Sequence, residues 1–204
     1  MNNKKLIYWL GGAPCAGKST IAEHISDKYH LTYYRVDDHF ERHIKQTNPI
    51  NHPACDAFKK MGPEEIWMAP VSLQLTREWK IYQELFDFIL ADLMELPKPV
   101  IVEGAGCLPG LVNPFLALNQ AGVWIVPSND FHDLYYEKRD WSPQFVKDTS
   151  NPQQAYLNWM KRDHAFAEKI RQQTKELNLS CLVVDGSQSL QENMIWVEKE
   201  LGLR

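Results

Sequence analysis

The chain has 204 residues, of which 44% are hydrophobic and 24% are charged, and its formal net charge is −4 at pH 7. This length is enough for one domain with a substantial core, and the composition is ordinary for a globular protein. The acidic balance argues against binding to long nucleic acids, which usually requires a basic face. The sequence also lacks the run of about 18 apolar residues that a membrane span needs.

Two features of the sequence bear on the cellular compartment. The N-terminal stretch MNNKKLIYWLGG has two lysines before an apolar run of about six residues, which is shorter than the apolar region of a signal peptide. The run leads directly into a glycine-rich loop, so we interpret it as a buried strand. The four cysteines form no CxxC pair, which argues against a zinc site or a disulfide framework and favours the cytoplasm. They are Cys15, Cys55, Cys107 and Cys181.

The first third of the chain is predicted to alternate between strand and helix. Residues 5–11 are expected to form a buried strand, followed by a glycine-rich loop and a helix from about residue 17 to residue 29. A second β-rich run at 32–36 ends in two aspartates. The polar stretch 39–62 is interpreted as a loop or a short helix.

The alternation continues to the end of the chain. Residues 64–96 have the apolar spacing of a long helix that is broken or kinked near Pro70. The remaining predicted elements are a short strand in VIVEGAG at 100–106, a strand at 121–128, a helix-to-loop region at 129–152, a helix at 153–177, a strand with a turn at 180–189 and a helix at about 190–201. Strands that alternate with helices predict an α/β fold with a parallel sheet covered on both faces.

The strongest motif is GAPCAGKS at residues 12–19, which matches G-x-x-x-x-G-K-[ST] completely. Backbone N–H groups of such a loop hold phosphate oxygens, the lysine reaches the β- and γ-phosphates, and the serine ligates Mg²⁺. A glycine turn that merely caps a helix is the alternative, and the predicted flanking strand and helix argue against it. We expect a nucleotide to be bound by Gly12, Ala13, Pro14, Cys15, Ala16, Gly17, Lys18, Ser19 and Thr20.

Acidic residues follow two of the predicted strands, at the sheet edge where ligands bind in parallel α/β folds. We expect Asp37 to act as a base or to orient an acceptor hydroxyl, and Glu103 to hold the acceptor or the water shell of Mg²⁺. Ser19 is the expected direct Mg²⁺ ligand, with Asp37 or Glu103 acting through water. Asp38 competes with Asp37, because neighbouring strand residues point to opposite faces. A solvated turn or a helix N-cap is the alternative for the aspartate pair.

Arginines are expected to neutralise the charge that develops during phosphoryl transfer. Arg139 precedes a polar, proline-containing loop, and Arg162 lies on the helix that follows; Arg171 is a weaker candidate further along. A solvated charge on a helix face is the alternative for each of them. The turn VDGS, which contains Gly186, is expected to lie beside the phosphate loop and to contact the nucleotide base.

Together these residues resemble the P-loop kinases of the nucleoside-monophosphate-kinase-like group. This group includes shikimate kinase, gluconate kinase, adenylate kinase, chloramphenicol phosphotransferase and the zeta toxins. The resemblance covers most of the chain in order, through GAPCAGKS, VDD, VEGAG, a lid arginine, KRD and VDGS, of which only the first is specific. The chain lacks Gly-Gly-Gly after the third strand and Asp-x-Asp after the second, which argues against shikimate kinase itself, and it has no convincing nucleoside-monophosphate clamp.

The resemblance implies a three-layer P-loop fold with a five-stranded parallel sheet in the order 2-3-1-4-5, and ATP with Mg²⁺ as cofactors. It implies a single domain over 1–204, with a helical acceptor-side insertion at about 40–97 and a helical lid at about 139–152. Most of the aromatic residues in these regions are expected in the core, and one or two are expected to line an acceptor pocket. These aromatic residues are Trp67, Trp79, Tyr82, Trp141 and Trp159.

The leading functional hypothesis is an ATP-dependent kinase that transfers the γ-phosphoryl group to a hydroxyl of a metabolite, sugar, nucleoside or antibiotic. One alternative is a nucleotide-dependent switch, although the Asn-Lys-x-Asp that reads a guanine base is missing. Another is a toxin-like kinase that acts on a nucleotide sugar or a 5′-hydroxyl. The expected partner is a small-molecule acceptor, not a long nucleic acid or a membrane, and the expected state is a monomer or a homodimer.

Overall fold

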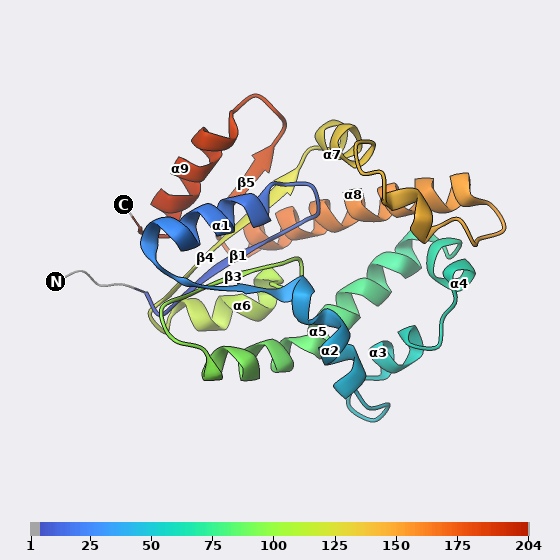
Figure 1. Ribbon diagram of the computed structural model, residues 1–204, viewed down its shortest axis with the longest axis horizontal. Coiled ribbons are helices and arrows are strands. Elements are labelled where there is room, and N and C mark those ends of the chain that lie inside the picture. Colours follow the sequence, from blue (N-terminus) through green and yellow to red (C-terminus); the bar gives the residue numbers. More distant parts are fainter. Residues whose placement is uncertain (1–4, 204) are drawn as a thin grey trace.

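The computed structural model describes residues 5–203, in which five parallel strands form one sheet in the order β2-β3-β1-β4-β5. The predicted α/β fold and strand order are therefore confirmed (Figure 1). The strands are β1 (Ile7–Gly12), β2 (Thr32–Arg35), β3 (Val100–Glu103), β4 (Gln120–Pro127) and β5 (Cys181–Val184). The strand β1 lies between β3 and β4, and its Leu10 is in register with Glu103 of β3. This register sets Glu103 beside the loop that follows β1.

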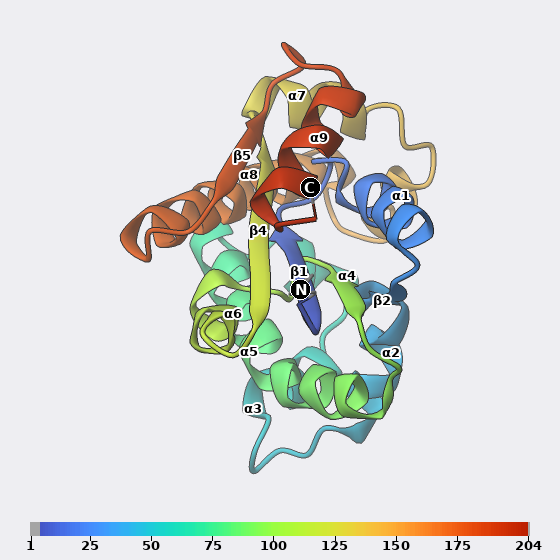
Figure 2. The same ribbon diagram turned by 90° about the vertical axis from the view of Figure 1, so that its left-hand side faces the viewer.

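Helices cover both faces of the sheet because successive strand residues point to opposite sides. In β1, Tyr8 and Leu10 pack into a cluster with α1 and α9, whereas Trp9 packs into a cluster with α5, α6 and α8. Figure 2 shows α1 and α6 on opposite sides of the sheet. The helices are α1 (Lys18–Tyr29), α2 (Val36–Gln46), α3 (Pro53–Phe58), α4 (Pro63–Trp67), α5 (Val71–Glu95), α6 (Pro109–Leu116), α7 (Asn129–Tyr136), α8 (Pro152–Glu176) and α9 (Leu190–Glu200), with a 3₁₀ turn, η1 (Ser142–Phe145).

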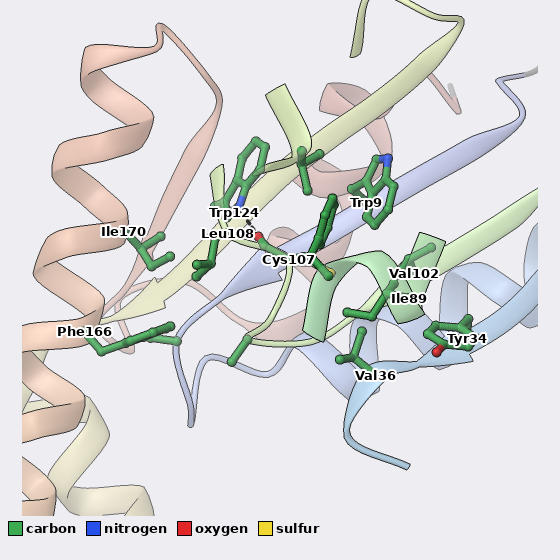
Figure 3. Packing of buried hydrophobic residues seen from close by; sticks show 14 of the residues in the cluster. Trp9, Tyr34, Val36, Ile89, Val102, Cys107, Leu108, Trp124, Phe166 and Ile170 are labelled. Carbon is green, nitrogen blue, oxygen red and sulfur yellow. Dashed lines mark hydrogen bonds between the residues drawn. The ribbon is translucent and has the colours of Figure 1, made fainter. Parts of the chain in front are cut away.

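The larger of these clusters holds three buried tryptophans, Trp9, Trp79 and Trp124, of which Figure 3 labels Trp9 and Trp124. The Trp9 ring lies 5.9 Å from the Phe86 ring of α5, between their centroids. The Trp124 indole N–H donates a hydrogen bond of 2.8 Å to the backbone carbonyl of Cys107, which satisfies the polar atom of a buried aromatic side chain. This contact fastens the segment after β3 to β4, close to the ends of the strands that carry the phosphate loop and Glu103.

Most of the predicted elements are confirmed, including the helix break near Pro70, where α4 ends and α5 begins at Val71. The predicted strand at 32–36 is one residue too long, because β2 ends at Arg35 and α2 begins at Val36. Asp37 and Asp38 therefore lie in the first turn of a helix, where the helix dipole favours acidic side chains. The expectation that they point to opposite faces of a strand was wrong for this reason.

Two further helical segments differ from the sequence-based expectation. The stretch 39–62, expected to be a loop or a short helix, contains most of α2 and all of α3. The helix α6 was not predicted, since its sequence PGLVNPFL contains two prolines and a glycine, which have low helix propensity. Within residues 5–203, no helix combines the length and the apolar character needed to cross a bilayer.

Candidate functional site

The phosphate loop connects β1 to α1, as the motif predicts. Its first glycine, Gly12, has φ +129°, and a side chain there would place Cβ 1.8 Å from the carbonyl oxygen of Ile125 on β4. Gly17 has φ +79° and forms the N-cap of α1. Only glycine has the conformational freedom for these positions. The glycines therefore bring the loop backbone against the sheet and turn the N-terminus of α1 toward the space above it.

Lys18, Ser19 and Glu103 form a buried cluster at the start of α1. The Lys18 ammonium donates a hydrogen bond of 2.7 Å to the carbonyl oxygen of Ala13, and its Nζ lies 3.9 Å from Glu103 Oε1. The Ser19 hydroxyl donates to Glu103 Oε2 over 3.1 Å. Glu103 is only 2% exposed, and these contacts compensate the burial of its charge.

Tyr33 of β2 completes the surroundings of Glu103. Its hydroxyl donates a hydrogen bond of 3.2 Å to Glu103 Oε2. Burial raises the pKa of Tyr33 well above its ordinary value, and the nearby carboxylate of Glu103 raises it further. The phenol thus stays protonated and acts as a donor that holds the carboxylate in place. The sequence analysis did not identify Tyr33, although its position two residues before the end of β2 is a usable signal.

A cavity of about 340 Å³ lies above the loop, and we call it the phosphate cavity. Its lining includes Lys18, Ser19 and Glu103, and also Asp37 and Arg139, which the sequence analysis proposed from distant segments. The structure therefore brings these five predicted residues to one cavity, together with the predicted loop residues Pro14, Cys15, Ala16, Gly17 and Thr20.

Asp38 lies outside the lining of the phosphate cavity. It is exposed, and its Oδ1 lies 3.8 Å from Nε of Arg35. Arg35 itself lines the cavity, and its Nε is buried without a hydrogen-bond partner. Arg35 was not identified from the sequence. It stands at the end of β2, directly before VDD, so the argument from strand ends that selected the acids applies to it as well.

A second cavity of about 440 Å³, the nucleoside cavity, adjoins the first. The two cavities share the lining residues Cys15, Ala16, Gly17, Thr20 and Arg139. Gly186 lines the nucleoside cavity, as predicted, and so do Phe131 and Tyr135 of α7, whose rings stack with centroids 4.3 Å apart. These two aromatic residues were missed, although their spacing of four residues places them on one face of a helix.

Arg139 connects the two cavities because it lines both of them. Its guanidinium lies over the rings of Tyr136 and Trp141, at 4.8 and 5.4 Å from their centroids. Within the described chain, no carboxylate comes within ion-pair distance of Arg139. Burial raises the pKa of the neighbouring Cys15 thiol, which therefore stays neutral. Arg139 is thus a cation held by aromatic rings beside the phosphate loop.

Arg162 lies elsewhere and is engaged by acids. Its Nη1 donates to Glu78 Oε2 over 2.6 Å, and its Nε lies 2.8 Å from Asp163 Oδ1. Burial raises the pKa of Glu78 despite the adjacent guanidinium. The Arg162 side chain lines a third cavity and is absent from the lining of the phosphate cavity. Arg171 is more exposed and pairs with Glu168 at 2.8 Å, away from all three of these cavities.

The third cavity, which we call the apolar cavity, has a volume of about 390 Å³. Tyr82 of α5 lines both the apolar cavity and the phosphate cavity, so it stands at their boundary. Among the aromatic residues highlighted in the sequence, Trp67 and Tyr82 line the apolar cavity, whereas Trp79 and Trp159 are buried in the core. The fifth, Trp141, is 45% exposed and touches Arg139.

A network of histidines and aspartates joins α7 to α8 behind Arg139. Asp133 Oδ1 lies 2.7 Å from His164 Nε2 and 3.0 Å from His132 Nδ1, and His132 Nε2 lies 3.2 Å from Asp163 Oδ2. Burial lowers the pKa of His132, but the hydrogen bonds to Asp163 and Asp133 outweigh it and raise the pKa overall. The network anchors the base of the segment that leads from α7 into η1.

Comparison with known proteins identifies the fold. No protein-family model matches this sequence, and no curated protein matches it. Among solved structures, the chain is similar to shikimate kinase from Acinetobacter baumannii in complex with shikimate (16% identity, 98% of this chain and 93% of that chain, TM-score 0.52). It is also similar to shikimate kinase from Aquifex aeolicus vf5 (18% identity, 97% and 96%, TM-score 0.50). The fold is therefore that of the P-loop kinases.

Proposed function

We propose that this chain is an ATP-dependent kinase that transfers the γ-phosphoryl group to a hydroxyl of a small molecule. The observation that carries the proposal is the cluster of Lys18, Ser19 and Glu103 at the phosphate loop, facing the same cavity as Asp37. A binding module needs the loop, but it has no need of an additional carboxylate, Asp37, in the lining of the phosphate cavity. The P-loop kinase fold is consistent with this assignment.

Each residue has a role that follows from its position. The loop backbone and Lys18 hold the β- and γ-phosphates, and Arg139 reaches from the nucleoside cavity to the same phosphates. Ser19 Oγ and Glu103 Oε2 are oxygen donors 3.1 Å apart, which suits Mg²⁺ with Ser19 as a direct ligand and Glu103 holding its water. When bound, Mg²⁺ would neutralise charge on the phosphate oxygens.

The proposed reaction is a direct transfer. A bond forms between the acceptor oxygen and the γ-phosphorus, while the bond from that phosphorus to the bridging oxygen of ADP breaks. Asp37 accepts the proton of the acceptor hydroxyl. Arg35, which lines the cavity beside Asp37, compensates negative charge on that side.

The proposal is tested by the release of ADP from MgATP, with and without a panel of hydroxylated small molecules. We expect one class of compound to stimulate release, and Lys18→Ala to reduce the stimulated rate by about 100-fold or more. Lys45→Ala is the matched control, because Lys45 is exposed and, within residues 5–203, pairs only with Glu41. Full stimulated activity in Lys18→Ala would contradict the proposal. ATP turnover that no compound stimulates would favour a nucleotide-dependent switch.

A further inference from the structure

The lining of the apolar cavity restricts which acceptors could bind. This inference rests on the proposed function. We propose that the acceptor is a compact alcohol with a flat apolar body and one hydrogen-bond donor, rather than a polyol. Its body would occupy the apolar cavity, and its reacting hydroxyl would extend past Tyr82 to Asp37 in the phosphate cavity. Tyr82 lines both cavities, and Asp37 lines the phosphate cavity.

The walls of the apolar cavity are mostly hydrocarbon. They come from α2, α3, α4, α5, η1 and α8, and the main apolar residues are Phe40, Phe58, Ile66, Trp67, Ile81 and Phe145. A volume of about 390 Å³ lies near the lower end of the usual range for small-molecule sites. A compact molecule therefore fits, and its apolar surface would be removed from water on binding.

Trp67 contributes a flat ring to the wall of the apolar cavity. Its ring stacks on Trp159 with centroids 4.5 Å apart and an interplanar angle of 29°. The Arg162 guanidinium lies 5.7 Å from the Trp67 ring centroid. Phe145 of η1 packs edge-on against Trp159 at 5.9 Å and is 55% exposed. A planar body would stack on these rings with a geometry that aromatic pairs favour.

The polar groups in the walls are largely satisfied by one another. Gln74 Nε2 donates to the carbonyl oxygens of Trp67 and Ala69, at 3.0 and 2.9 Å. Arg77 donates to the Ile66 carbonyl at 2.7 Å, and the Glu78 Oε2 atom accepts from Arg162. A polyol would bury several hydroxyls against these walls with few partners, at a cost of about 1–3 kcal/mol for each unpaired group.

Two oxygen atoms in the walls of the apolar cavity can accept a hydrogen bond from a donor group of the ligand. Gln74 Oε1 is buried without a hydrogen-bond partner. Glu78 Oε1 accepts a hydrogen bond of 3.3 Å from the Tyr82 hydroxyl, and a carboxylate oxygen accepts more than one. Burial raises the pKa of Tyr82 well above its ordinary value, so this phenol stays protonated and keeps its proton for the hydrogen bond to Glu78.

The experiment separates binding from turnover. Isothermal titration calorimetry measures binding of 4-ethylaniline, which has a flat ring and N–H donors but no hydroxyl. Release of ADP is measured with 2-(4-aminophenyl)ethanol, its hydroxylated counterpart, and with myo-inositol and gluconate as polyols. We expect both aryl compounds to bind with a Kd in the range of about 1 mM or tighter. We expect the hydroxylated one to stimulate ADP release about 10-fold more than either polyol.

Three variants assign the binding to the apolar cavity. Trp67→Ala should raise the Kd of 4-ethylaniline by about 10-fold. Phe145→Ala should raise it by about 3-fold, and because Phe145 is half exposed this variant is expected to fold even if Trp67→Ala does not. Leu157→Ala is the control, since Leu157 is 51% exposed on α8 and lies outside the lining of the apolar cavity.

Each outcome bears on one of the two proposals. Aryl binding that weakens in both cavity variants supports the acceptor class. ADP release that no compound of the whole panel stimulates, despite such binding, would contradict the kinase instead. If a polyol drives ADP release while neither aryl compound binds, the acceptor class is overturned and the kinase stands. Aryl binding that is unchanged in Trp67→Ala and Phe145→Ala also overturns it, because the ligand then lies elsewhere.

Discussion

The Ser19 hydroxyl donates a hydrogen bond of 3.1 Å to Glu103, a residue 84 positions later in the chain. The contact joins the first turn of α1 to the end of β3, and the register of β1 with β3 makes it possible. Glu103 also accepts from Tyr33 and lies near Lys18, so the start of α1 and the strand β2 converge on one buried carboxylate of β3. This arrangement holds the expected Mg²⁺ ligands in position before any nucleotide arrives.

We expect Glu103→Gln to lower kcat by about 100-fold, because the amide keeps the size of the side chain but loses the charge that holds the water shell of Mg²⁺. The concentration of Mg²⁺ that gives half-maximal activity should rise in the same variant. Steady-state kinetics over a range of Mg²⁺ concentrations measures both effects. An unchanged Mg²⁺ dependence would show that Glu103 has only a structural role.

The two aspartates of α2 offer a matched pair of variants. Asp37→Asn should lower kcat by about 100-fold or more, since Asp37 lines the phosphate cavity and is the proposed proton acceptor. Asp38→Asn should change kcat by less than about 3-fold, since Asp38, although exposed like Asp37, lies outside the lining of that cavity. Parallel measurement of kcat and KM for both variants checks the assignment. The reverse order of effects would assign the proton acceptor to Asp38.

We expect replacement of Arg139 to lower kcat, and replacement of Arg162 to lower the free energy of unfolding. Arg139→Ala should lower kcat by about 1,000-fold, the scale seen when a charge-neutralising arginine is removed from a phosphoryl-transfer site. It should change the free energy of unfolding by less than about 1 kcal/mol, because Arg139 has no carboxylate partner within residues 5–203. Urea unfolding followed by circular dichroism, together with kinetics, distinguishes the two effects.

Arg162→Ala should lower the free energy of unfolding by about 3–5 kcal/mol, because it leaves Glu78 buried without its cation and leaves Asp163 with His132 alone. The same urea titration measures this loss. A loss of stability below about 1 kcal/mol, combined with a large loss of kcat, would instead give Arg162 a direct role in transfer.

Asp92 of α5 should make stability depend on pH. Its carboxylate accepts hydrogen bonds from Arg42, Tyr34 and His43. Burial raises the pKa of Asp92, but these hydrogen bonds outweigh it and hold the pKa well below its ordinary value. A depressed pKa in the folded state stabilises the protein above the unfolded pKa of about 3.9, and this contribution is lost as the pH falls below that value.

Asp92→Asn should therefore lower the free energy of unfolding by about 2 kcal/mol at neutral pH. The difference from the unmodified protein should narrow as the pH falls from about 5 toward about 2. Chemical denaturation at several pH values measures it. Asp87→Asn is the control, because Asp87 lies exposed on the same helix. A difference that stays constant over this range would assign the effect to packing rather than charge.

The phosphate loop and the fold could be predicted because their signals are local. The motif at residues 12–19 specifies a strand, a tight turn and a helix, and the alternation of apolar runs with helical patterns specifies the parallel sheet. The position of Gly186 beside the loop also followed from the order of the elements.

The parts that could not be predicted depend on contacts between distant segments. The separation of Asp37 from Asp38 depends on α2 beginning at Val36, a residue whose side chain packs against Gly104 after β3. The partners of Arg162 could not be predicted either, because Glu78 lies 84 residues before it. Local sequence shows that an arginine is present, but only the packing of α5 on α8 decides which acid it meets.

The nucleoside cavity has walls from three parts of the described chain. The phosphate loop and the start of α1 form one, Phe131, Tyr135 and Arg139 form the second, and Val184, Gly186 and the residues at the start of α9 form the third. A ribosome-bound nascent chain that still lacks β5 and α9 would therefore have the phosphate loop but an incomplete nucleoside cavity. Nucleotide affinity should then rise late in synthesis, so that a labelled nucleotide reports when the last strand has joined the sheet.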